Sequence, residues 1–391
     1  MNGTTRLPLG PTIQARPNFC PACDGRQIIK RGLRKNSYRH LQLYFCKDCR
    51  KYFSSLAGLK GVKYPPRVIA RALCLYNLGH SQQETVRRIA SEHRITVPPR
   101  TLSDWTSAYR SITTFHRLRP VAVRQFRQRM LRERTLHHQQ VYQYKVHLAK
   151  LGLTADSVPQ DVAIRVKTYL LGIFDDFPDR FFQDDPTGDD GPQATPDDPS
   201  RAPAAMRSSK SRFEVLPLSR SEKQNLANDL AALGLLLARK NRERHPSVQD
   251  FMLANDSCTI ACEVPVYLTG EELGYYKAKG FFVTLPDAAK PITGHIDVVQ
   301  ARNGFIHLLD YKPNASKIEP INQLVVYALA FASRTRLPVK VFKCAWFDEK
   351  DYFEFFPLQA IKARSAPTAP PTIAPVPPPI AIRPTPLALS R

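Results

Sequence analysis

The chain has 391 residues, of which 57 are Lys or Arg and 34 are Asp or Glu, so its formal net charge is +23. Residues 1–150 carry 29 basic and 6 acidic side chains, which places the whole net charge in the first part of the chain. Such a localised positive charge is typical of nucleic-acid-binding proteins. The length excludes one small module and predicts two or three domains.

The sequence contains no apolar run near the roughly 20 residues that cross a bilayer, and residues 1–19 lack the apolar core of a signal peptide. We therefore expect a cytoplasmic, nucleoid-associated protein with no membrane partner. The oligomeric state stays open, with a homodimer among the alternatives.

Four of the eight cysteines form two CxxC pairs, Cys20 with Cys23 and Cys46 with Cys49. A CxxC turn directs two sulfur atoms to the same side, and two such pairs supply the four ligands of a tetrahedral structural zinc ion. The alternatives are a redox-active CxxC and chance spacing. We predict a zinc-binding unit over residues 18–60, after a flexible N-terminus over residues 1–17.

Residues 61–115 show the pattern of three short helices. The first begins after Pro65, the second with a capping box at Ser81 and Glu84, and the third after Pro99. Tight turns separate the three helices, which is the arrangement of a small tri-helical unit.

The cysteine unit and these helices together resemble the zinc ribbon and helix-turn-helix at the front of many prokaryotic transposases. The resemblance implies that the third helix enters the major groove of DNA, with Leu102 and Trp105 packed inward. The side chains that it would present to DNA are Arg100, Thr101, Ser103, Asp104 and Ser107. The alternative is a small helical bundle with no role in DNA binding.

The composition changes three more times along the chain. Residues 116–182 are basic and helix-compatible, and we interpret them as a helical connector, either an arm that follows DNA or a solvated helix. Residues 183–212 hold few large apolar side chains and are predicted to be a disordered linker. Residues 213–362 form a second globular region, and residues 363–391 a disordered Pro-rich tail.

The second globular region contains four segments with polar residues in a mostly apolar setting. Three are strand-like, at residues 262–266, 294–299 and 308–313, and one is helical, at residues 323–327. Asn303 and Gly304 predict a tight hairpin between the second and third of these segments. Because side chains alternate along a strand, Asp310 and Lys312 share one face, and the hairpin brings Asp297 beside them.

Two carboxylates beside a lysine suit a hard divalent cation, since Mg²⁺ is often held by one or two carboxylates, water and phosphate. The arrangement resembles the PD-(D/E)XK nuclease superfamily, particularly its RecB-type branch, over residues 245–357. The resemblance implies an α/β (α+β) restriction-endonuclease-like domain with a central mixed sheet flanked by helices. It also implies that Asp297 and Asp310 bind the metal and that Lys312 orients or activates the attacking water.

The same resemblance implies further site residues. Gln323 and Tyr327, one helical turn apart, would border the site, and Glu263 would be an additional acidic member. The histidine that the RecB-type branch carries on an early helix would be His245, with His295 as the alternative.

We therefore expect a multidomain, metal-dependent DNA endonuclease that hydrolyses phosphodiester bonds and is associated with a mobile element. The expected cofactors are structural Zn²⁺ and catalytic Mg²⁺ or Mn²⁺, and the expected partner is DNA. The alternative is a sequence-specific DNA-binding regulator, or a transposition accessory protein, with a non-catalytic nuclease-like domain. The set of Asp297, Asp310 and Lys312 favours the enzyme, although each residue alone would be an ordinary surface charge.

Overall fold

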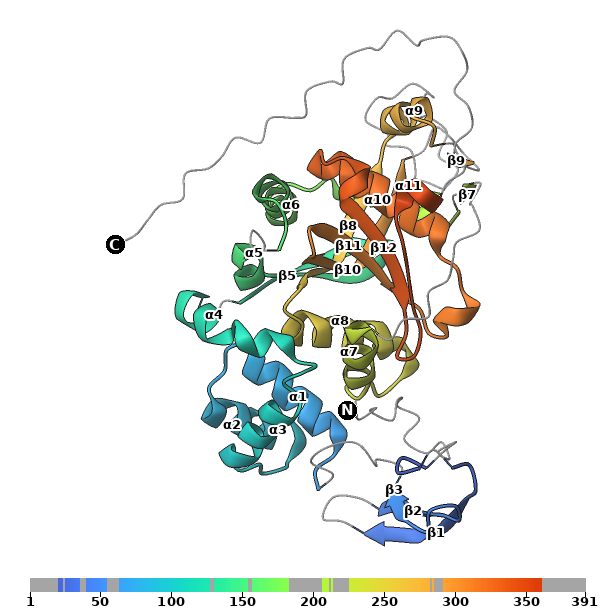
Figure 1. The fold of residues 1–391 in the computed structure, drawn as a ribbon. Coiled ribbons are helices and arrows are strands. Elements are labelled where there is room, and N and C mark those ends of the chain that lie inside the picture. Colours follow the sequence, from blue (N-terminus) through green and yellow to red (C-terminus); the bar gives the residue numbers. More distant parts are fainter. Residues whose placement is uncertain are drawn as a thin grey trace, which may run out of the picture.

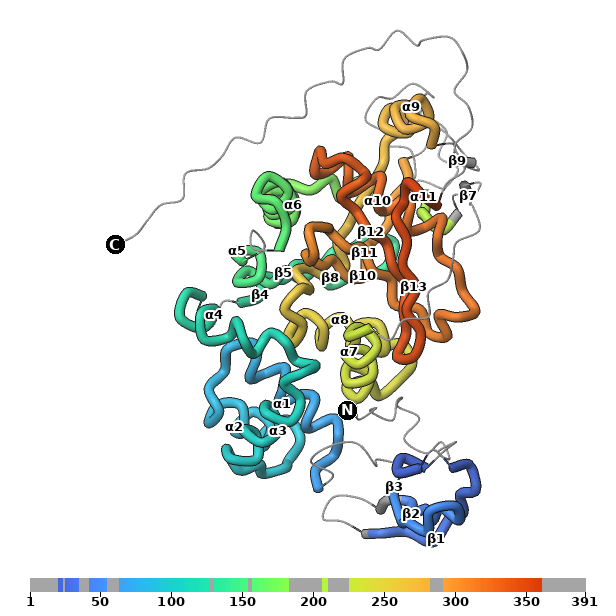
Figure 2. Tube along the Cα trace, viewed as in Figure 1, coloured from blue at the N-terminus to red at the C-terminus, as the bar shows by residue number. Residues whose placement is uncertain are grey.

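The computed structural model describes residues 20–23, 25–35, 40–54, 63–126, 130–153, 157–182, 206–210, 212–213, 225–281, 283–284 and 291–360. The chain passes from a small sheet through a group of three helices into a large sheet covered by helices (Figure 1, Figure 2). The predicted zinc-binding, tri-helical and second globular regions follow one another in this order.

The small sheet is antiparallel, with strand order β1 (Ile28–Lys35), β2 (His40–Cys46) and β3 (Tyr52–Ser54). Its core is slight. Tyr44 is 1% exposed and its ring stacks on Phe53 with the centroids 5.7 Å apart. So little apolar surface gives a unit of this size only marginal stability, which is the situation in which a structural metal is commonly found.

The three helices predicted from the sequence are confirmed. They are α1 (Pro66–Asn77), α2 (Gln82–His93) and α3 (Pro99–Ala108). The Ser81 hydroxyl caps α2 by accepting a hydrogen bond from the Glu84 backbone N at 3.1 Å. Leu73, Ile89 and Leu102, one from each helix, are fully buried where the helices meet.

The large sheet is mixed and has eight strands. Its strands are β4 (Leu131–His138), β5 (Gln140–His147), β6 (Met206–Arg207), β8 (Thr259–Leu268), β10 (Ile292–Arg302), β11 (Phe305–Tyr311), β12 (Phe342–Phe347) and β13 (Tyr352–Phe355). The order is β13-β12-β11-β10-β8-β5-β4, and β6 pairs with β10. The β11–β12 and β6–β10 pairs are parallel and the others antiparallel.

Helices cover both faces of this sheet, as the predicted α/β layout requires (Figure 1). On one face lie α7 (Leu226–Leu235) and α8 (Arg244–Asn255), and on the other α6 (Gln160–Gly172) and α10 (Ile321–Thr335). The remaining helices are α4 (Arg119–Phe126), α5 (Leu148–Leu153), α9 (Gly270–Ala278) and α11 (Pro357–Ala360). The short elements are η1 (Thr114–Arg117), η3 (Asp179–Phe182), η4 (Ser208–Lys210), η5 (Asn241–Glu243), η6 (Ala315–Lys317), η7 (Val339–Val341), β7 (Arg212–Phe213) and β9 (Val283–Thr284).

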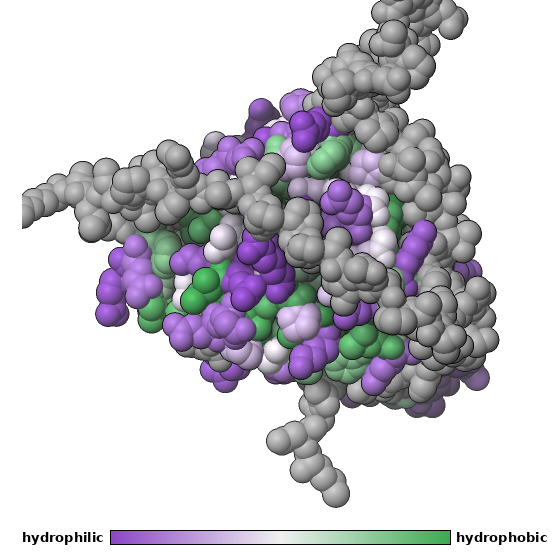
Figure 3. Space-filling view, turned by 90° about the horizontal axis from the view of Figure 1, so that it is seen from above, coloured by the Kyte–Doolittle hydropathy of each residue, from purple (hydrophilic) through white to green (hydrophobic). Residues whose placement is uncertain are grey.

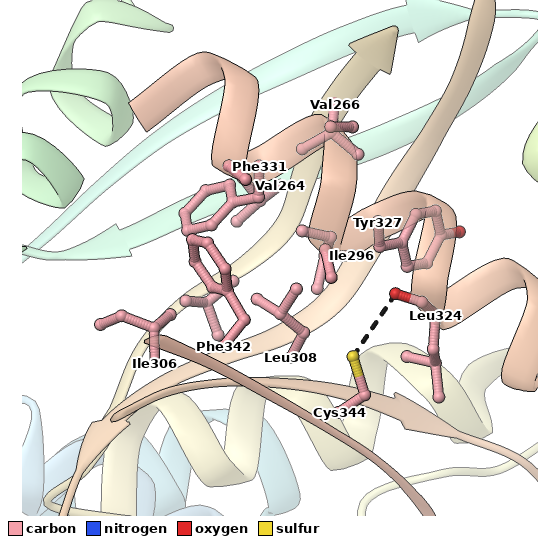
Figure 4. Packing of buried hydrophobic residues seen from close by; sticks show 14 of the residues in the cluster. Val264, Val266, Ile296, Ile306, Leu308, Leu324, Tyr327, Phe331, Phe342 and Cys344 are labelled. Atoms are coloured by element: carbon pink, nitrogen blue, oxygen red, sulfur yellow. Dashed lines mark hydrogen bonds between the residues drawn. The ribbon is translucent and has the colours of Figure 1, made fainter. Parts of the chain in front are cut away.

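The core beneath α10 is built from alternate residues of the central strands. Ile296 and Leu308 point at the helix from β10 and β11, and Phe331 points back at them (Figure 4). The Cys344 thiol lies in the same layer and donates to the Leu324 carbonyl at 3.4 Å. This cysteine is therefore a buried, hydrogen-bonded core residue.

The predicted hairpin between β10 and β11 is confirmed. Asn303 and Gly304 have φ angles of 52° and 80°, the left-handed conformations that a two-residue hairpin turn requires. The turn sets the register, in which Val298 pairs with Leu309.

The prediction of a helical connector over residues 116–182 is wrong for β4 and β5, which extend the large sheet. Two of the basic residues that suggested a solvated helix, Arg132 and Arg134, lie on β4 and are paired with acids. Arg132 contacts Asp175 at 3.3 Å and Arg134 contacts Asp179 at 2.6 Å. The charge of this segment therefore serves packing contacts that no local pattern reveals.

The prediction of a disordered linker over residues 183–212 is wrong where the structure describes it. Met206 is 6% exposed and pairs with Ile292, so a short strand forms here because it completes the edge of β10. The rest of the predicted linker before residue 206, the N-terminus over residues 1–17 and the tail over residues 363–391 lie outside the described residues.

The outer surface mixes polar and apolar side chains. On the face drawn in Figure 3, hydrophilic and hydrophobic residues are interspersed wherever the chain is coloured. Across the described ranges, no helix combines the length and the apolar character needed to cross a membrane.

Helix α1 is joined to α8 by a buried polar contact. Asn77 donates to the Asn255 side-chain oxygen at 2.8 Å, and the Asn255 amide donates to Cys74 Sγ at 3.2 Å and to the Phe251 carbonyl at 3.0 Å. Asn77 and Asn255 are 1% and 0% exposed. The tri-helical unit is thus fixed to the helix that covers the large sheet.

We expect Asn255→Ala to lower the free energy of unfolding by about 1–3 kcal/mol, because it leaves the buried Asn77 amide unpaired and opens a small void. Chemical denaturation measures the change. Asn241→Ala, at an exposed position before α8, is the matched control and should be nearly neutral. Equal effects of the two substitutions would contradict the structural role of the contact.

Candidate functional site

The four cysteines of the small sheet converge. Their Sγ atoms all lie within 4.8 Å of one another, with Cys20 and Cys49 at 3.6 Å and Cys23 and Cys46 at 3.7 Å. Two turns position them, one before β1 and one after β2. Four sulfur ligands can hold a metal ion such as zinc and leave no open coordination position.

We expect the full chain to contain one zinc ion and Cys46→Ser to lose most of it, because the variant lacks one of four thiolate ligands. Elemental analysis after dialysis measures the zinc content. Cys258→Ser removes a half-buried cysteine elsewhere and should keep the metal. Zinc that survives Cys46→Ser at the original ratio would rule out this site.

A second group of polar residues forms a row across the large sheet. Val298 of β10 pairs with Cys262 of β8 and with Leu309 of β11. One residue further along, Asp297 therefore lies between Glu263 and Asp310. Three carboxyl groups from three adjacent strands are brought together, as expected from the sequence.

The row lies where the pairing of β10 with β11 ends. That pairing covers residues 298–302 of β10, whereas β6 pairs with β10 only at Ile292 and Thr293. Within the described part of the chain, residues 294–297 have no strand partner on that side. Asp297 Oδ2 instead accepts a hydrogen bond from the Tyr311 backbone N at 2.9 Å. The carboxyl groups thus lie beside a break in the strand pairing along this edge of β10.

The backbone at the row is irregular. Glu263 has a φ of 53°, which a residue with a side chain seldom adopts within a strand. On β8, Cys262 packs on one face of the sheet and Val264 on the other. Strained backbone of this kind typically costs about 1–3 kcal/mol and is concentrated at functional sites.

Lys312 accompanies Asp310, as the strand alternation predicts. Its Nζ lies 2.9 Å from Asp310 Oδ2, and the Asp310 side chain is 3% exposed against 23% for Lys312. Tyr311, between them, is fully buried and packs against Phe347 on the opposite face. The ammonium group is thus held at the rim of the site with its carboxylate partner inside.

Helix α8 supplies two side chains to the row. His245 Nδ1 lies 3.4 Å from Asp297 Oδ2, and Gln249 donates to Glu263 Oε1 at 2.7 Å. The two residues are four apart and therefore adjacent on one helical face. Gln249 was not predicted, and its spacing from His245 is the signal in the sequence that would have found it.

Helix α10 borders the row from the other face. Gln323 donates to the Tyr327 hydroxyl at 2.7 Å. Tyr327 approaches β10 so closely that a Cβ on Gly294 would lie 2.4 Å from its ring and 2.8 Å from Ser208 Oγ. Gly294 and Ser208 are thus further residues at this place that the sequence did not indicate.

Burial and mutual repulsion shape the ionisation of the row. Burial, together with the charge of Asp297, raises the pKa of Asp310 to about 7 and that of Glu263 to about 8. Burial opposes ionisation of Asp297 too, but the hydrogen bond and charge of His245, with Lys312, lower its pKa below the ordinary value. These three carboxyl groups, one buried and two half-buried, thus lack enough cationic neighbours to be ionised together.

This shortage of positive charge is what a divalent cation would relieve. The donors are carboxylate oxygens, which suit Mg²⁺ or Mn²⁺. The carboxylate oxygens are more widely spaced than the cysteine sulfur atoms. Among the described residues, only the cysteines form a group in which three or more possible metal ligands lie within 4.8 Å of one another. The chemistry of the donor set therefore fits a hard cation with water in part of its shell.

The predicted DNA-binding side chains lie on α3. Arg100 and Ser107 are exposed, whereas Thr101 and Ser103 are half-buried, and the Ser103 hydroxyl accepts a hydrogen bond from Gln82 at 2.9 Å. Leu102 and Trp105 are buried, 0% and 2% exposed, as predicted. The exposed face of α3 is polar and carries a cation at its N-terminus.

Comparison with known proteins identifies no relative: no family model, no curated protein and no solved structure matches the chain.

We expect the metal-free protein to lose stability as the pH rises from 6 to 8.5. A carboxyl group whose pKa is raised in the folded state contributes stability that is complete below its unfolded pKa and is lost as the pH passes its folded pKa. For Asp310, with a pKa of about 7, this loss over the interval is about 1 kcal/mol.

Asp310→Asn cannot titrate and should show a correspondingly shallower decline, as measured by denaturation in EDTA at several pH values. Asp161→Asn, at an exposed position on α6, is the control and should follow the unmodified protein. Parallel curves for Asp310→Asn and the unmodified protein would contradict the raised pKa.

Proposed function

We propose that the protein is a metal-dependent DNA endonuclease. The observation that carries the proposal is the row of Glu263, Asp297 and Asp310, of which Asp310 is buried and the others half-buried, and which is short of positive charge and lies where a strand pairing ends. A structural hairpin gains nothing from withdrawing three carboxyl groups from most of the solvent, because their desolvation is unfavourable. Sites that bind metal ions and phosphates have a use for this arrangement.

Asp297 and Asp310 would hold Mg²⁺ or Mn²⁺, with Glu263 as the neighbouring acid. When bound, such an ion polarises a phosphoryl oxygen and makes a bound water a stronger nucleophile. Gln249 keeps Glu263 in place through its 2.7 Å hydrogen bond, and His245 does the same for Asp297. These supporting contacts fix the carboxylates before substrate arrives.

Lys312 would stabilise the charge that develops on the scissile phosphate and orient the attacking water. Its ammonium group is partly exposed, and it is held in place by the 2.9 Å contact with Asp310. A preorganised cation of this kind stabilises a transition state because it need not move during the reaction. Gln323 and Tyr327 border the same place from α10.

The first 150 residues would bring the enzyme to DNA. They hold the whole net charge of the chain, the four-cysteine unit and the tri-helical unit. Neutralisation of DNA phosphates by Lys and Arg releases counterions, so binding through this region should weaken steeply as salt increases. Arg100, at the exposed start of α3, is the leading candidate for a contact with DNA.

We expect Asp310→Ala and Lys312→Ala each to lower metal-dependent cleavage of supercoiled DNA by about 100-fold or more, because each removes a charge that acts at the reacting phosphate. DNA affinity at a given salt concentration should change little. Lys317→Ala removes an exposed lysine in η6 and should cleave normally. Arg100→Ala should weaken binding and retain the rate of cleavage at saturating protein.

Gel assays of nicking and linearisation with Mg²⁺ or Mn²⁺, together with DNA-binding titrations, measure both quantities. Cleavage by Asp310→Ala at the original rate would overturn the proposal. So would an unmodified protein that binds DNA and never cleaves it, which is the behaviour of a regulator with a non-catalytic domain.

A further inference from the structure

A second polar cluster lies beside the acidic row. His138, at the end of β4, places its Nε2 2.7 Å from Asp179 Oδ1 and its Nδ1 2.9 Å from His295 Nε2. These contacts form a continuous chain of carboxylate, imidazole and imidazole that runs from η3 through β4 to β10. Of its members the sequence indicated only His295, as the alternative to His245, and the proposed machinery above does not use the chain.

Both rings are held firmly. His138 is 2% exposed, and its ring stacks on Phe182 with centroids 4.2 Å apart and an interplanar angle of 22°. The His295 ring stacks on Tyr142 at 3.6 Å with an angle of 12°. Stacking restricts rotation of the rings, so the hydrogen bonds of the chain keep one geometry.

The chain determines which nitrogen atoms carry hydrogen. A carboxylate only accepts hydrogen bonds, so His138 Nε2 is a donor to Asp179. Arg134 also contacts Asp179, at 2.6 Å, and already balances its charge. A further positive charge on the buried His138 ring would have no partner, so His138 Nδ1 is an acceptor and His295 Nε2 is the donor.

This arrangement leaves a lone pair on His295 Nδ1. Burial lowers the pKa of His138, which agrees with a neutral ring there. The His295 ring packs on Tyr142 and Phe182 and forms no ion pair with a described residue, so a positive charge on it would also have no partner. Within the described ranges, no hydrogen-bond partner of His295 Nδ1 is found, and the side chain is partly exposed. The free end of the chain is thus an acceptor.

The free end lies next to the acidic row. His295 precedes Asp297 by two residues on β10, and the charge of Asp297 acts on its ring. Burial and the charges of Glu263 and Asp297 raise the pKa of Tyr142, whose ring stacks on His295. Because the two nitrogens of an imidazole diverge, Nδ1 points away from His138.

We propose that Asp179 and His138 are positioning residues that fix the tautomer of His295, whose Nδ1 accepts a hydrogen bond from water at the acidic row during DNA cleavage. This inference rests on the proposed endonuclease function. The role is orientation: the water keeps its protons in this contact, and the imidazole gains none. A water held by such an acceptor is aligned for attack before the reaction starts.

The tautomer is tested without metal or DNA. We expect ¹⁵N NMR of histidine rings in the metal-free full chain to give His295 a protonated Nε2 and an Nδ1 with the shift of an unprotonated nitrogen. His295→Gln assigns the signals by their loss. A protonated His295 Nδ1 would overturn the proposal whether or not the protein cleaves DNA.

Variants of His138 test the effect on cleavage. His138→Phe keeps a ring on Phe182 but cannot accept from His295, and we expect turnover to fall about 10–100-fold with unchanged KM and DNA affinity. His138→Gln offers an amide oxygen to His295 and an amide nitrogen to Asp179, and it should restore most of the activity. A purely structural role would instead predict better tolerance of Phe than of Gln.

Asp179→Asn provides a second variant should the Phe substitution prevent folding, which thermal unfolding will show. An amide in place of the carboxylate can donate to His138 and reverse the chain, so the His295 Nδ1 signal should shift toward the protonated form and turnover should fall. Unchanged NMR signals and turnover in Asp179→Asn would overturn the positioning role. An unmodified protein without cleavage activity overturns the proposed function and, with it, the role of His295 in cleavage, while the NMR result on the tautomer stands independently.

Discussion

The crowding of three carboxyl groups in one row of the large sheet is the constraint on which the surrounding structure depends. Ionised carboxylates at such separations repel one another, and burial adds a desolvation cost to each. Each carboxyl group has a neighbour that offsets part of this cost. His245 contacts Asp297, Gln249 donates a hydrogen bond to Glu263, and Lys312 contacts Asp310. The apolar layers on both faces of the sheet supply the stability that allows such a site to exist.

The two faces of the sheet contribute in different ways. The face covered by α10 is a conventional apolar core that ends at Tyr327 and Gly294. Because Gly294 has no side chain, the helix and the strand can approach closely there. The other face is covered by α7 and α8, and its apolar layer continues into the tri-helical unit. The residues that support the carboxyl groups and those that dock the tri-helical unit thus belong to one continuous packing layer.

Local patterns predicted the parts of this structure that depend on local physics. The turn at Asn303 and Gly304 and the capping box at Ser81 follow from backbone preferences, and alternation along β11 placed Asp310 with Lys312. Strand β4, which pairs with β5, was missed because its arginines pair with acids more than 40 residues away in the chain. The short strand β6 was missed because two residues form a strand only when a neighbour such as β10 offers an edge. Likewise, the chain from Asp179 to His295 joins three elements, and no single segment of sequence carries its signal.

Helix α8 has a further geometric consequence. Its first turn carries His245 and its last residue, Asn255, contacts α1, so one rigid rod separates the acidic row from the tri-helical unit. Ten residues of helix span about 15 Å, so α8 sets a fixed distance between the acidic row and the tri-helical unit. Under the proposed function, this distance would set how many base pairs lie between the recognised sequence and the broken bond. The length of α8 is altered by inserting or deleting whole helical turns, whereas substitutions on the surface of either unit leave it unchanged.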